Sequence, residues 1–507
     1  MKEINIFFEG VDSIEGYQSE LLKRIAKEIH FNKCIFTEKC HDGQDVYDSE
    51  RYIPINYDIC ERNRYEEYCD VNKLLPLDAE ILEKMLPYES TALKMFVRNM
   101  EQEIYTYDES KRLYLDHLRF WNHMFITHNI NYVIQTCVPH HVHDYIIYGL
   151  AKIYKCKHVI NTATSIWNHW IPVEDIYGND TTLVRRYNDL RQSKEDYELS
   201  EFVEHYYQSL LYKNKDLDKN LINAGMSRKQ IMAQKREFYK SYFSMKNKIK
   251  RNKTHWKNLV LRGLLKGNGG EIVKRYESIR TNRDFAKRSS IKAHQMRSIK
   301  YYDKISGMPD YEECFVVFFL HYQPEATTLP QAGVFVEQEI IVSLLADTLA
   351  KRGIVLYVKE HFVQPYRQKV FYDRLKKMPN VRLIRSDIDS KELLQHSLAA
   401  ATCNGTVIQE SIFNGKPILT FGNGPFNGAP GTYQCRTAAD VENAVSEIEK
   451  GACPSAHDVR AYLKAFDETA VHTNIYPAMK NRRCDISMDE SIENMKAFVV
   501  RWVQENC

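Results

Sequence analysis

Five short apolar runs in the second half of the chain, separated by segments with helical periodicity, constrain the fold more than any other feature of the sequence. Each run is four to six residues long and nearly free of polar residues, which is typical of a strand buried on both faces. Strands that alternate with helices in this way predict a parallel sheet covered by helices on both sides. The expected strands are Phe315–Leu320, Ile354–Val358, Val381–Ile384, Leu398–Thr402 and Ile418–Phe421. The expected helices are Val336–Ala350, Tyr366–Lys377, Ser390–His396 and Thr406–Asn414.

The first half of the chain shows the same alternation less regularly. Strands are expected at Ile4–Phe8, Tyr132–Thr136 and His158–Ile160, and the stretch NTATSIWNHW after the third is expected to be a loop. Helical periodicity runs over Ser19–Ile29 and again over residues 144–154. A strand, a helix and a strand at this spacing indicate a βαβ unit. The 507 residues are enough for two such α/β domains.

A strongly basic block lies between the two halves. Residues 228–304 carry 23 Lys or Arg against 5 Asp or Glu, a local net charge of +18 in a chain whose total is +3. The block is helical in pattern and poor in apolar residues, so it is expected to be a linker or an insertion. Its charge favours an anionic partner, such as a membrane surface, a lipid-linked phosphate or a nucleic acid. A solvated helical face explains the same composition.

The end of the chain predicts one more helix. Ser487 and Glu490 have the spacing of a capping box, and an apolar face follows them. We expect this helix to pack back on the first domain. The chain is therefore divided into an N-terminal Rossmann-like domain, a basic helical segment, a C-terminal Rossmann-like domain and a terminal helix. Their expected ranges are 1–227, 228–305, 306–480 and 481–507.

Cysteine usage and hydropathy indicate the compartment. The 12 cysteines are scattered, without a C-x-x-C pair or a Cys/His spacing typical of zinc. Free thiols of this kind are typical of a reducing cytoplasm. The first ten residues lack the apolar length of a signal peptide, and no stretch reaches the roughly 18 apolar residues of a membrane span. A cytoplasmic protein is expected, with any membrane contact peripheral and made through 228–304.

Polar residues follow the expected strand that ends the stretch VLYVKEHF. Lys359, Glu360 and His361 come directly after its apolar residues. In a doubly wound parallel sheet, ligands bind outside the carboxyl ends of the strands. Lys359 and His361 are therefore candidate ligand contacts, and Glu360 is interpreted as structural. A surface ion pair between Lys359 and Glu360 is the alternative.

A second candidate is the stretch ATCNGTVIQESIFNGKPILTFG. After an expected strand, Gly405 follows Asn404 in a tight turn and a helix begins near Thr406, a pattern that suits an anion. Gly405 would let a phosphate approach the backbone, and Thr406 would add a hydroxyl. Glu410, with Ser411 beside it, lies one turn further along, where a carboxylate can accept both hydroxyls of a ribose.

Two further stretches are polar at expected strand ends. HYQPEATTLPQAGVFVEQ follows the first strand of the second half, although an ordinary loop would be polar too. Its candidate binding residues are His321, Gln323, Thr327 and Thr328. PHHVHDY, residues 139–145, holds three histidines; a ligand-facing loop is favoured over a metal site, because adjacent histidines do not easily share one ion. In SDID, residues 386–389, a helix cap at Asp389 or Ser390 explains the pattern better than a metal-binding pair.

These stretches occur in one order and at spacings that resemble the capsule polysaccharide biosynthesis family, whose members include bacterial Kdo transferases. They also resemble, more distantly, sialyltransferase-type enzymes with two facing Rossmann-like domains, the GT-B architecture. The resemblance covers residues 315–431 and, more weakly, the stretch that begins at Pro139. It implies a GT-B-like α/β fold and an inverting, metal-independent glycosyltransferase without a cofactor. The implied donor is a nucleotide-sugar, often a CMP-linked keto-acid sugar, and the implied acceptor is a glycan or a lipid-linked glycan.

The resemblance also assigns residues. The family's His-Pro motif maps onto His361, although this chain has Phe362 where the family has proline. The family's glycine–threonine turn and helix carboxylate map onto Gly405, Thr406 and Glu410. The negative charge that grows on a departing phosphate would be met by His361, Lys359 and the helix start.

The acceptor hydroxyl needs a general base, which in this architecture comes from the N-terminal domain. Glu9, Asp12 and Glu15 follow the first strand and are the candidates, although each also fits an ordinary polar loop. A phosphotransferase of the teichoic-acid type that uses a CDP-alcohol is one alternative function. A non-hydrolysing sugar-nucleotide epimerase and a nucleic-acid-binding protein are two others. No nucleic-acid partner is expected, because the sequence has no motif with aromatic platforms at a recognised spacing.

Overall fold

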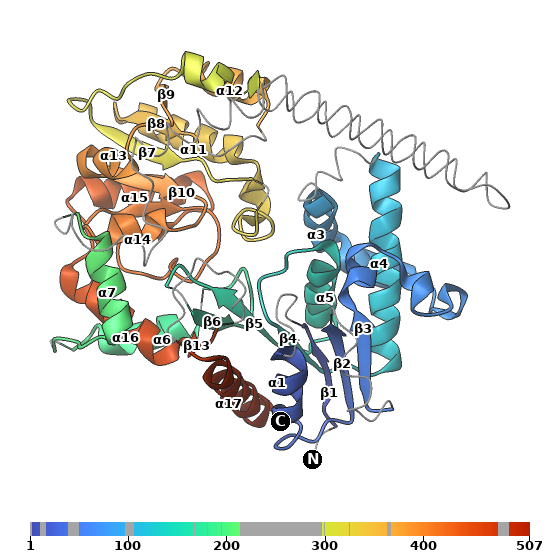
Figure 1. Ribbon diagram of the computed structural model, residues 1–507. Helices are drawn as coiled ribbons and strands as arrows, with labels where there is room; N and C mark the ends of the chain where they lie inside the picture. Colours follow the sequence, from blue (N-terminus) through green and yellow to red (C-terminus); the bar gives the residue numbers. More distant parts are fainter. Residues whose placement is uncertain are drawn as a thin grey trace, which may run out of the picture.

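The computed structural model describes residues 3–10, 17–38, 50–96, 106–166, 168–179, 181–193, 195–212, 297–298, 300–323, 325–361, 367–474 and 486–507. Within these ranges the chain forms two α/β domains, each built on its own sheet (Figure 1). The basic helical insertion expected at 228–305 lies almost entirely outside the described residues. Asp12 and Glu15 also lie outside them.

The N-terminal sheet has seven strands among the described residues, in the order β13-β6-β5-β4-β1-β2-β3. The five from β5 to β3 are parallel, and β6 and β13 add an antiparallel edge. The strands are β1 (Asn5–Phe8), β2 (Lys33–Glu38), β3 (Tyr52–Asn56), β4 (Tyr132–Gln135), β5 (Lys157–Ala163), β6 (His169–Val173) and β13 (Val471–His472). The helices and 3-10 turns before the second sheet are α1 (Tyr17–Ile25), α2 (Tyr57–Glu61), η1 (Tyr65–Glu67), η2 (Val71–Lys73), α3 (Ala79–Met95), α4 (Tyr107–Thr127), α5 (Val142–Ile153), α6 (Thr182–Leu190) and α7 (Glu201–Leu210).

The C-terminal sheet has six strands among the described residues, all parallel, in the order β12-β11-β10-β7-β8-β9. The order reverses between β7 and β10, which makes the sheet doubly wound with its switch point there. The strands are β7 (Phe315–Phe319), β8 (Val355–Lys359), β9 (Val381–Ile384), β10 (Ala399–Thr402), β11 (Ile418–Thr420) and β12 (Thr432–Gln434). The helices are η5 (Gly333–Val336), α11 (Gln338–Ala350), α12 (Lys369–Leu375), α13 (Ser390–His396), α14 (Val407–Ile412), α15 (Ala438–Glu449), α16 (Ala456–Thr469) and α17 (Met488–Asn506).

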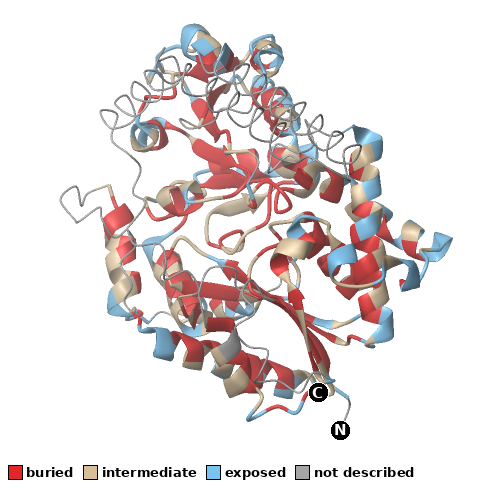
Figure 2. Cartoon of the chain, turned by 45° about the vertical axis from the view of Figure 1, so that its right-hand side comes forward, coloured by how far each residue is buried: buried red, intermediate tan, exposed pale blue. Residues whose placement is uncertain are grey.

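Burial explains why the apolar runs form strands. Every residue of β7 and of β10 is buried, whereas the helices that cover the sheets expose one side (Figure 2). Side chains on opposite faces of β7 enter two different cores, with Val317 in one and Phe318 in the other. The predicted fold class, α/β with two facing Rossmann-like domains in a GT-B-like arrangement, is confirmed.

The carboxyl edges of the two sheets face each other. Ser165, which follows β5, donates a hydrogen bond to the side chain of Gln409 in α14, directly after β10. The hydroxyl of Tyr177 contacts that of Tyr145 in α5 at 2.8 Å and donates to the carbonyl of Pro330, after β7, at 3.2 Å. Loops that follow strands of one sheet therefore contact loops that follow strands of the other.

The last helix, α17, lies beside α1 in the N-terminal domain (Figure 1). Arg24 of α1 pairs with Asp489 at 2.6 Å and with Glu493 at 2.7 Å. The Ser487 hydroxyl caps the helix, accepting from the Glu490 N–H at 3.2 Å. The chain has already returned to the N-terminal sheet at β13, which precedes residue 481, where the terminal segment was expected to begin.

Some sequence-based boundaries differ from the structure. NTATSIWNHW is not all loop, because β5 continues to Ala163 and β6 begins at His169. The helix expected over Tyr366–Lys377 is the shorter α12. Within the described ranges, no helix has both the length and the apolar character needed to cross a bilayer.

Candidate functional site

The loops that follow β7 and β10 meet at the switch point of the C-terminal sheet. Gly405 has a φ of +98°, which few residues other than glycine adopt. A Cβ atom on Gly405 would lie 2.6 Å from Cε1 of His321, so the imidazole lies directly against the glycine. His361, which follows β8, joins them through Tyr322, whose ring centroid is 5.8 Å from that of His361. The structure therefore brings His321, Gly405 and His361 to the same edge of the C-terminal sheet.

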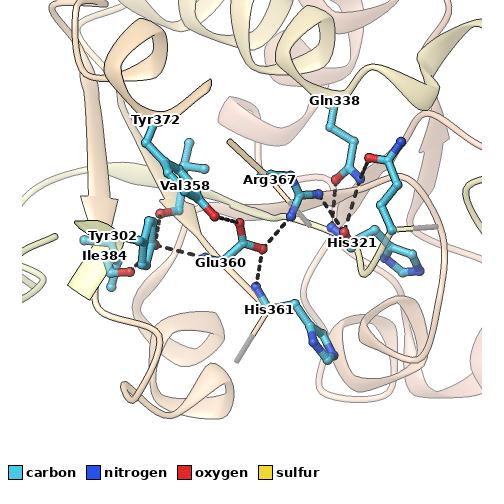
Figure 3. A network of polar contacts seen from close by, with 10 residues as sticks. Tyr302, His321, Gln338, Val358, Glu360, His361, Arg367, Tyr372 and Ile384 are labelled. Atoms are coloured by element: carbon cyan, nitrogen blue, oxygen red, sulfur yellow. Dashed lines mark hydrogen bonds and ion pairs between the residues drawn. The ribbon is translucent and has the colours of Figure 1, made fainter. Parts of the chain in front are cut away.

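A buried ion pair organises these loops (Figure 3). Glu360 is 4% exposed, and its Oε1 accepts from Nη1 of Arg367 at 2.6 Å and from the backbone N–H of His361 at 2.8 Å. The other carboxylate oxygen accepts from the Tyr372 hydroxyl at 2.7 Å. Arg367 also donates to the carbonyl of His321 at 2.6 Å. The interpretation of Glu360 as a structural residue is consistent with these contacts.

Both imidazoles are held neutral. Burial lowers the pKa of His361 to about 3, helped by the positive charges of Lys359 and Arg367 and by His321. Burial also lowers the pKa of His321 to about 4, with Arg367 adding to the effect. A neutral imidazole still offers one N–H donor. A bound anion would oppose the positive surroundings and raise both pKa values.

Lys359, the last residue of β8, and Glu410, in α14, lie close enough to interact electrostatically. Lys359 is 6% exposed, and its ammonium lies 3.2 Å from the Ser390 hydroxyl at the start of α13. Burial raises the pKa of Glu410 to about 7; Asp389 adds to the rise, and Lys391 and Lys359 oppose it. Glu410 therefore exchanges its proton near neutral pH.

The other predicted residues around α14 have mixed surroundings. Thr406 is exposed, while Ser411 is fully buried and donates to the carbonyl of Lys416 at 3.1 Å. The N–H of Gly405 donates to Oδ1 of Asn404 at 2.8 Å. The absence of a side chain at Gly405 therefore makes room for the His321 imidazole, and the Gly405 N–H is not a free donor. α14 is only six residues long, so its dipole is small.

The polar residues after β7 mainly close their own loop. Gln323 donates to the carbonyl of Val336 at 3.2 Å. The hydroxyls of Thr328, which is fully buried, and Thr327 both donate to Glu325. Of this predicted set, His321 is the residue that the structure brings against Gly405.

The N-terminal sheet has its own switch point, between β1 and β4, and Glu9 lies there. Its side chain is 3% exposed and accepts from the backbone N–H of Thr136 at 3.1 Å. Burial raises the pKa of Glu9 well above its ordinary value, and the nearby carboxylate of Asp144 raises it further. Burial beside a second carboxylate leaves Glu9 with little access to an acceptor hydroxyl, so this geometry disfavours Glu9 as a general base.

Asp144 organises the histidine-rich loop. Its Oδ2 accepts from the backbone N–H groups of His140 at 3.2 Å and His141 at 2.9 Å, and its Oδ1 lies 2.9 Å from Nε2 of His143. Burial alone would raise the pKa of Asp144, but His143 and His141 outweigh it and hold the pKa below its usual range. His143 points into the core, stacked on His117, whereas the His141 side chain is 27% exposed. Among the described residues, no group of three His, Cys, Asp or Glu side chains is arranged to hold a metal.

Three residues of the site were not predicted from the sequence. Arg367 and Asp144 hold backbone groups of the site, and Gln338 holds both sides of the His321 peptide, accepting from its N–H at 2.7 Å and donating to its carbonyl at 3.2 Å. Each lies in or beside a helix in a sequence context typical of a surface residue. No spacing rule indicates that the fold buries them.

No family model matches the chain, and no curated protein matches it. Among solved structures it is similar to KpsC, a β-Kdo 2,4 transferase of Thermosulfurimonas dismutans, at 17% identity and a TM-score of 0.23, covering 42% of this chain and 63% of that one. It is similar to a glycosyltransferase of Rickettsia africae at 10% identity and a TM-score of 0.24, over 100% of both chains. A Methanocaldococcus jannaschii UDP-GlcNAc 2-epimerase gives 10% identity and 0.25, over 90% and 98%. The fold class rests on the order and direction of the strands in the two sheets.

Proposed function

We propose that the protein is a GT-B glycosyltransferase of bacterial surface polysaccharide synthesis. It transfers a sugar from a nucleotide donor, of the CMP-linked keto-acid class, to a glycan or lipid-linked acceptor. The observation that carries this proposal is the contact between His321 and Gly405 at the switch point of an all-parallel, doubly wound sheet. Open α/β sheets bind their ligands at this position.

The donor site is assigned from the chemistry of its residues. The imidazoles of His361 and His321 donate hydrogen bonds to the donor phosphate, and Gly405 leaves room for the His321 imidazole at this position. Lys359 supplies a buried positive charge beside them. As the bond to the sugar breaks, negative charge grows on the phosphate, and these groups stabilise it without moving. Glu410 accepts hydrogen bonds from the ribose hydroxyls.

The acceptor is activated from the N-terminal domain. Glu9 is poorly suited to this step, because it is buried beside the carboxylate of Asp144. His141 starts α5 at the facing edge, with a partly exposed imidazole whose backbone is held by Asp144. We assign His141 as the base that removes the proton from the acceptor hydroxyl. No metal ion and no cofactor enter this scheme.

A nucleotide screen tests the proposal. Thermal melting is measured with CMP, CDP, UDP and GDP, because a ligand that binds only the folded state raises the melting temperature. CMP is expected to raise it in the wild type and not in His361→Ala. The control is His396→Ala, which removes an exposed imidazole of α13 in the same domain. Stabilisation by none of the four nucleotides would refute the proposal.

The donor substrate distinguishes the alternative functions. Transfer from a CMP-sugar releases CMP, and a CDP-alcohol phosphotransferase also releases CMP but requires CDP-glycerol as donor. An epimerase would convert a UDP-sugar without any acceptor. Turnover of either of these substrates, with none of a CMP-sugar, would replace the proposed function.

A peripheral membrane contact through residues 228–304 is part of the proposal. It is supported by the local net charge of +18. Each Lys or Arg near an anionic surface contributes roughly 1 kcal/mol of attraction, which salt screens. Salt-sensitive binding to vesicles that contain anionic lipid is expected, and equal binding to neutral vesicles would exclude this part.

A further inference from the structure

We infer that the buried ion pair of Glu360 and Arg367 is a positioning device, which sets His321 and His361 together for the phosphate of a nucleotide ligand. The inference rests on the proposed function and deepens it, because it concerns how the same site recognises a phosphate. Neither charged residue is placed in contact with the ligand. Both act through the backbone of the two histidines.

The contacts join two loops that follow different strands (Figure 3). Oε1 of Glu360 accepts from the backbone N–H of His361 at 2.8 Å, after β8, and from Nη1 of Arg367 at 2.6 Å. Nη2 of the same guanidinium donates to the carbonyl of His321 at 2.6 Å, after β7. One carboxylate oxygen and one guanidinium therefore link the main chain of both histidines.

Further contacts satisfy the remaining polar atoms around this link. The backbone N–H of Glu360 donates to the hydroxyl oxygen of Tyr302 at 3.0 Å, and the Tyr372 hydroxyl donates to Oε2 of Glu360 at 2.7 Å. Gln338 bonds both the N–H and the carbonyl of His321. The carboxylate is thus bonded on both of its oxygens, and the His321 peptide is held from two sides.

Stability alone does not account for this ion pair. The side chains of Glu360 and Arg367 are 4% and 6% exposed, and removing two charges from water costs several kcal/mol for each ion. Apolar residues of similar volume often give equal or greater stability at such positions. What this pair adds is fixed hydrogen-bond geometry, directed at two residues of the carboxyl edge. Placement within a fraction of an ångström is what a preorganised phosphate site needs.

The test compares Arg367→Lys with Tyr372→Phe. Arg367→Lys keeps a positive charge but replaces the planar guanidinium with an ammonium group. Its single nitrogen cannot hold Glu360 and the His321 carbonyl in the geometry that two separate guanidinium nitrogens give. Tyr372→Phe is the matched control, because it removes one buried hydrogen bond from the same carboxylate and touches neither histidine. The measured quantity is the ratio of the dissociation constants of cytidine and CMP, which isolates the contribution of the phosphate. Isothermal titration calorimetry gives both constants.

In the wild type the ratio is expected to be large. Arg367→Lys should lower the ratio about tenfold or more, because the two imidazoles are then no longer held together for the phosphate. Tyr372→Phe should leave it within about twofold of the wild type. Gln338→Met, which frees the His321 peptide without changing any charge, should lower the ratio in the same direction as Arg367→Lys. If Arg367→Lys does not fold, the Gln338→Met result decides.

Each outcome has a distinct meaning. An unchanged ratio in Arg367→Lys and Gln338→Met, with a large ratio in the wild type, overturns the inference and leaves the proposed function standing. An equal loss in Tyr372→Phe also overturns it, because the network would then be only a structural core. A wild type that binds cytidine as tightly as CMP refutes the phosphate site itself, and with it the proposed function.

Discussion

Gly405→Ala is the substitution whose effect follows most directly from the structure. At a φ of +98° an alanine is strained by roughly 1–2 kcal/mol, since L side chains clash there with the backbone. Its Cβ would also lie 2.6 Å from Cε1 of His321, closer than carbon atoms pack. The His321 peptide is bonded to Gln338 and Arg367 and cannot easily retreat. The imidazole or the turn must therefore shift.

The expected result is a loss of stability of about 1 kcal/mol or more, together with an affinity for CMP that is about tenfold weaker or more. Urea denaturation and calorimetry measure them. Gly353→Ala is the control: its φ is +68°, nothing lies within 4 Å of the added Cβ, and it lies before β8, at the opposite edge of the sheet. It should lose stability and keep its CMP affinity. Unchanged CMP affinity in Gly405→Ala would refute the reasoning.

Three further predictions follow from pKa values. Burial raises the pKa of Glu9, so any stability that its carboxyl group contributes is present below its unfolded pKa, about 4.5, and is lost as pH rises. In urea denaturation at pH 7, Glu9→Gln should therefore leave the stability unchanged or higher. Asp144→Asn should lower it, because the pKa of Asp144 is held below its usual range. The lowered pKa values of His321 and His361 mean that stability present above about pH 6.5 is lost as pH falls; a double His→Gln variant should show a smaller drop in melting temperature between about pH 7 and 5. Burial raises the pKa of Glu410 to about 7, so the affinity for cytidine, measured by calorimetry, should rise between about pH 6 and 8. A cytidine affinity that does not change with pH in the wild type, or that changes equally in Glu410→Gln, would contradict the assignment of Glu410 to the ribose.

The C-terminal sheet was largely predictable from the sequence, for a physical reason. Strands buried on both faces must be apolar throughout, so the expected strands Phe315–Leu320 and Leu398–Thr402 match β7 and β10 to within one residue. The helix expected at Ser390–His396 coincides with α13. The predicted cap at Asp389 is also confirmed, since its side chain accepts from the Lys391 N–H at 2.9 Å. β6, with the sequence HWIPV, was missed because it pairs antiparallel near the sheet edge and contains Pro172, a residue that argues against a strand.

The candidate site was predictable only where position after a strand is itself the signal. His321, His361 and Gly405 each follow a buried strand of one parallel sheet, and topology brings them to one edge. The partners of these residues were not predictable, because Arg367 reaches its targets only through the tertiary fold. Glu9 shows the converse case. Its place after β1 predicted a base, but the fold buries it against a carboxylate from a distant part of the chain.

The central claim is that His321, His361 and the Gly405 turn hold the phosphate of a nucleotide. Nitrogen-15 NMR of histidine side chains, assigned with His321→Gln and His361→Gln, tests it most directly. With CMP, both imidazole signals should move toward the protonated form, because a bound phosphate dianion raises their pKa, and cytidine should leave them in place. Signals of these two histidines that stay fixed while CMP binds would contradict the account.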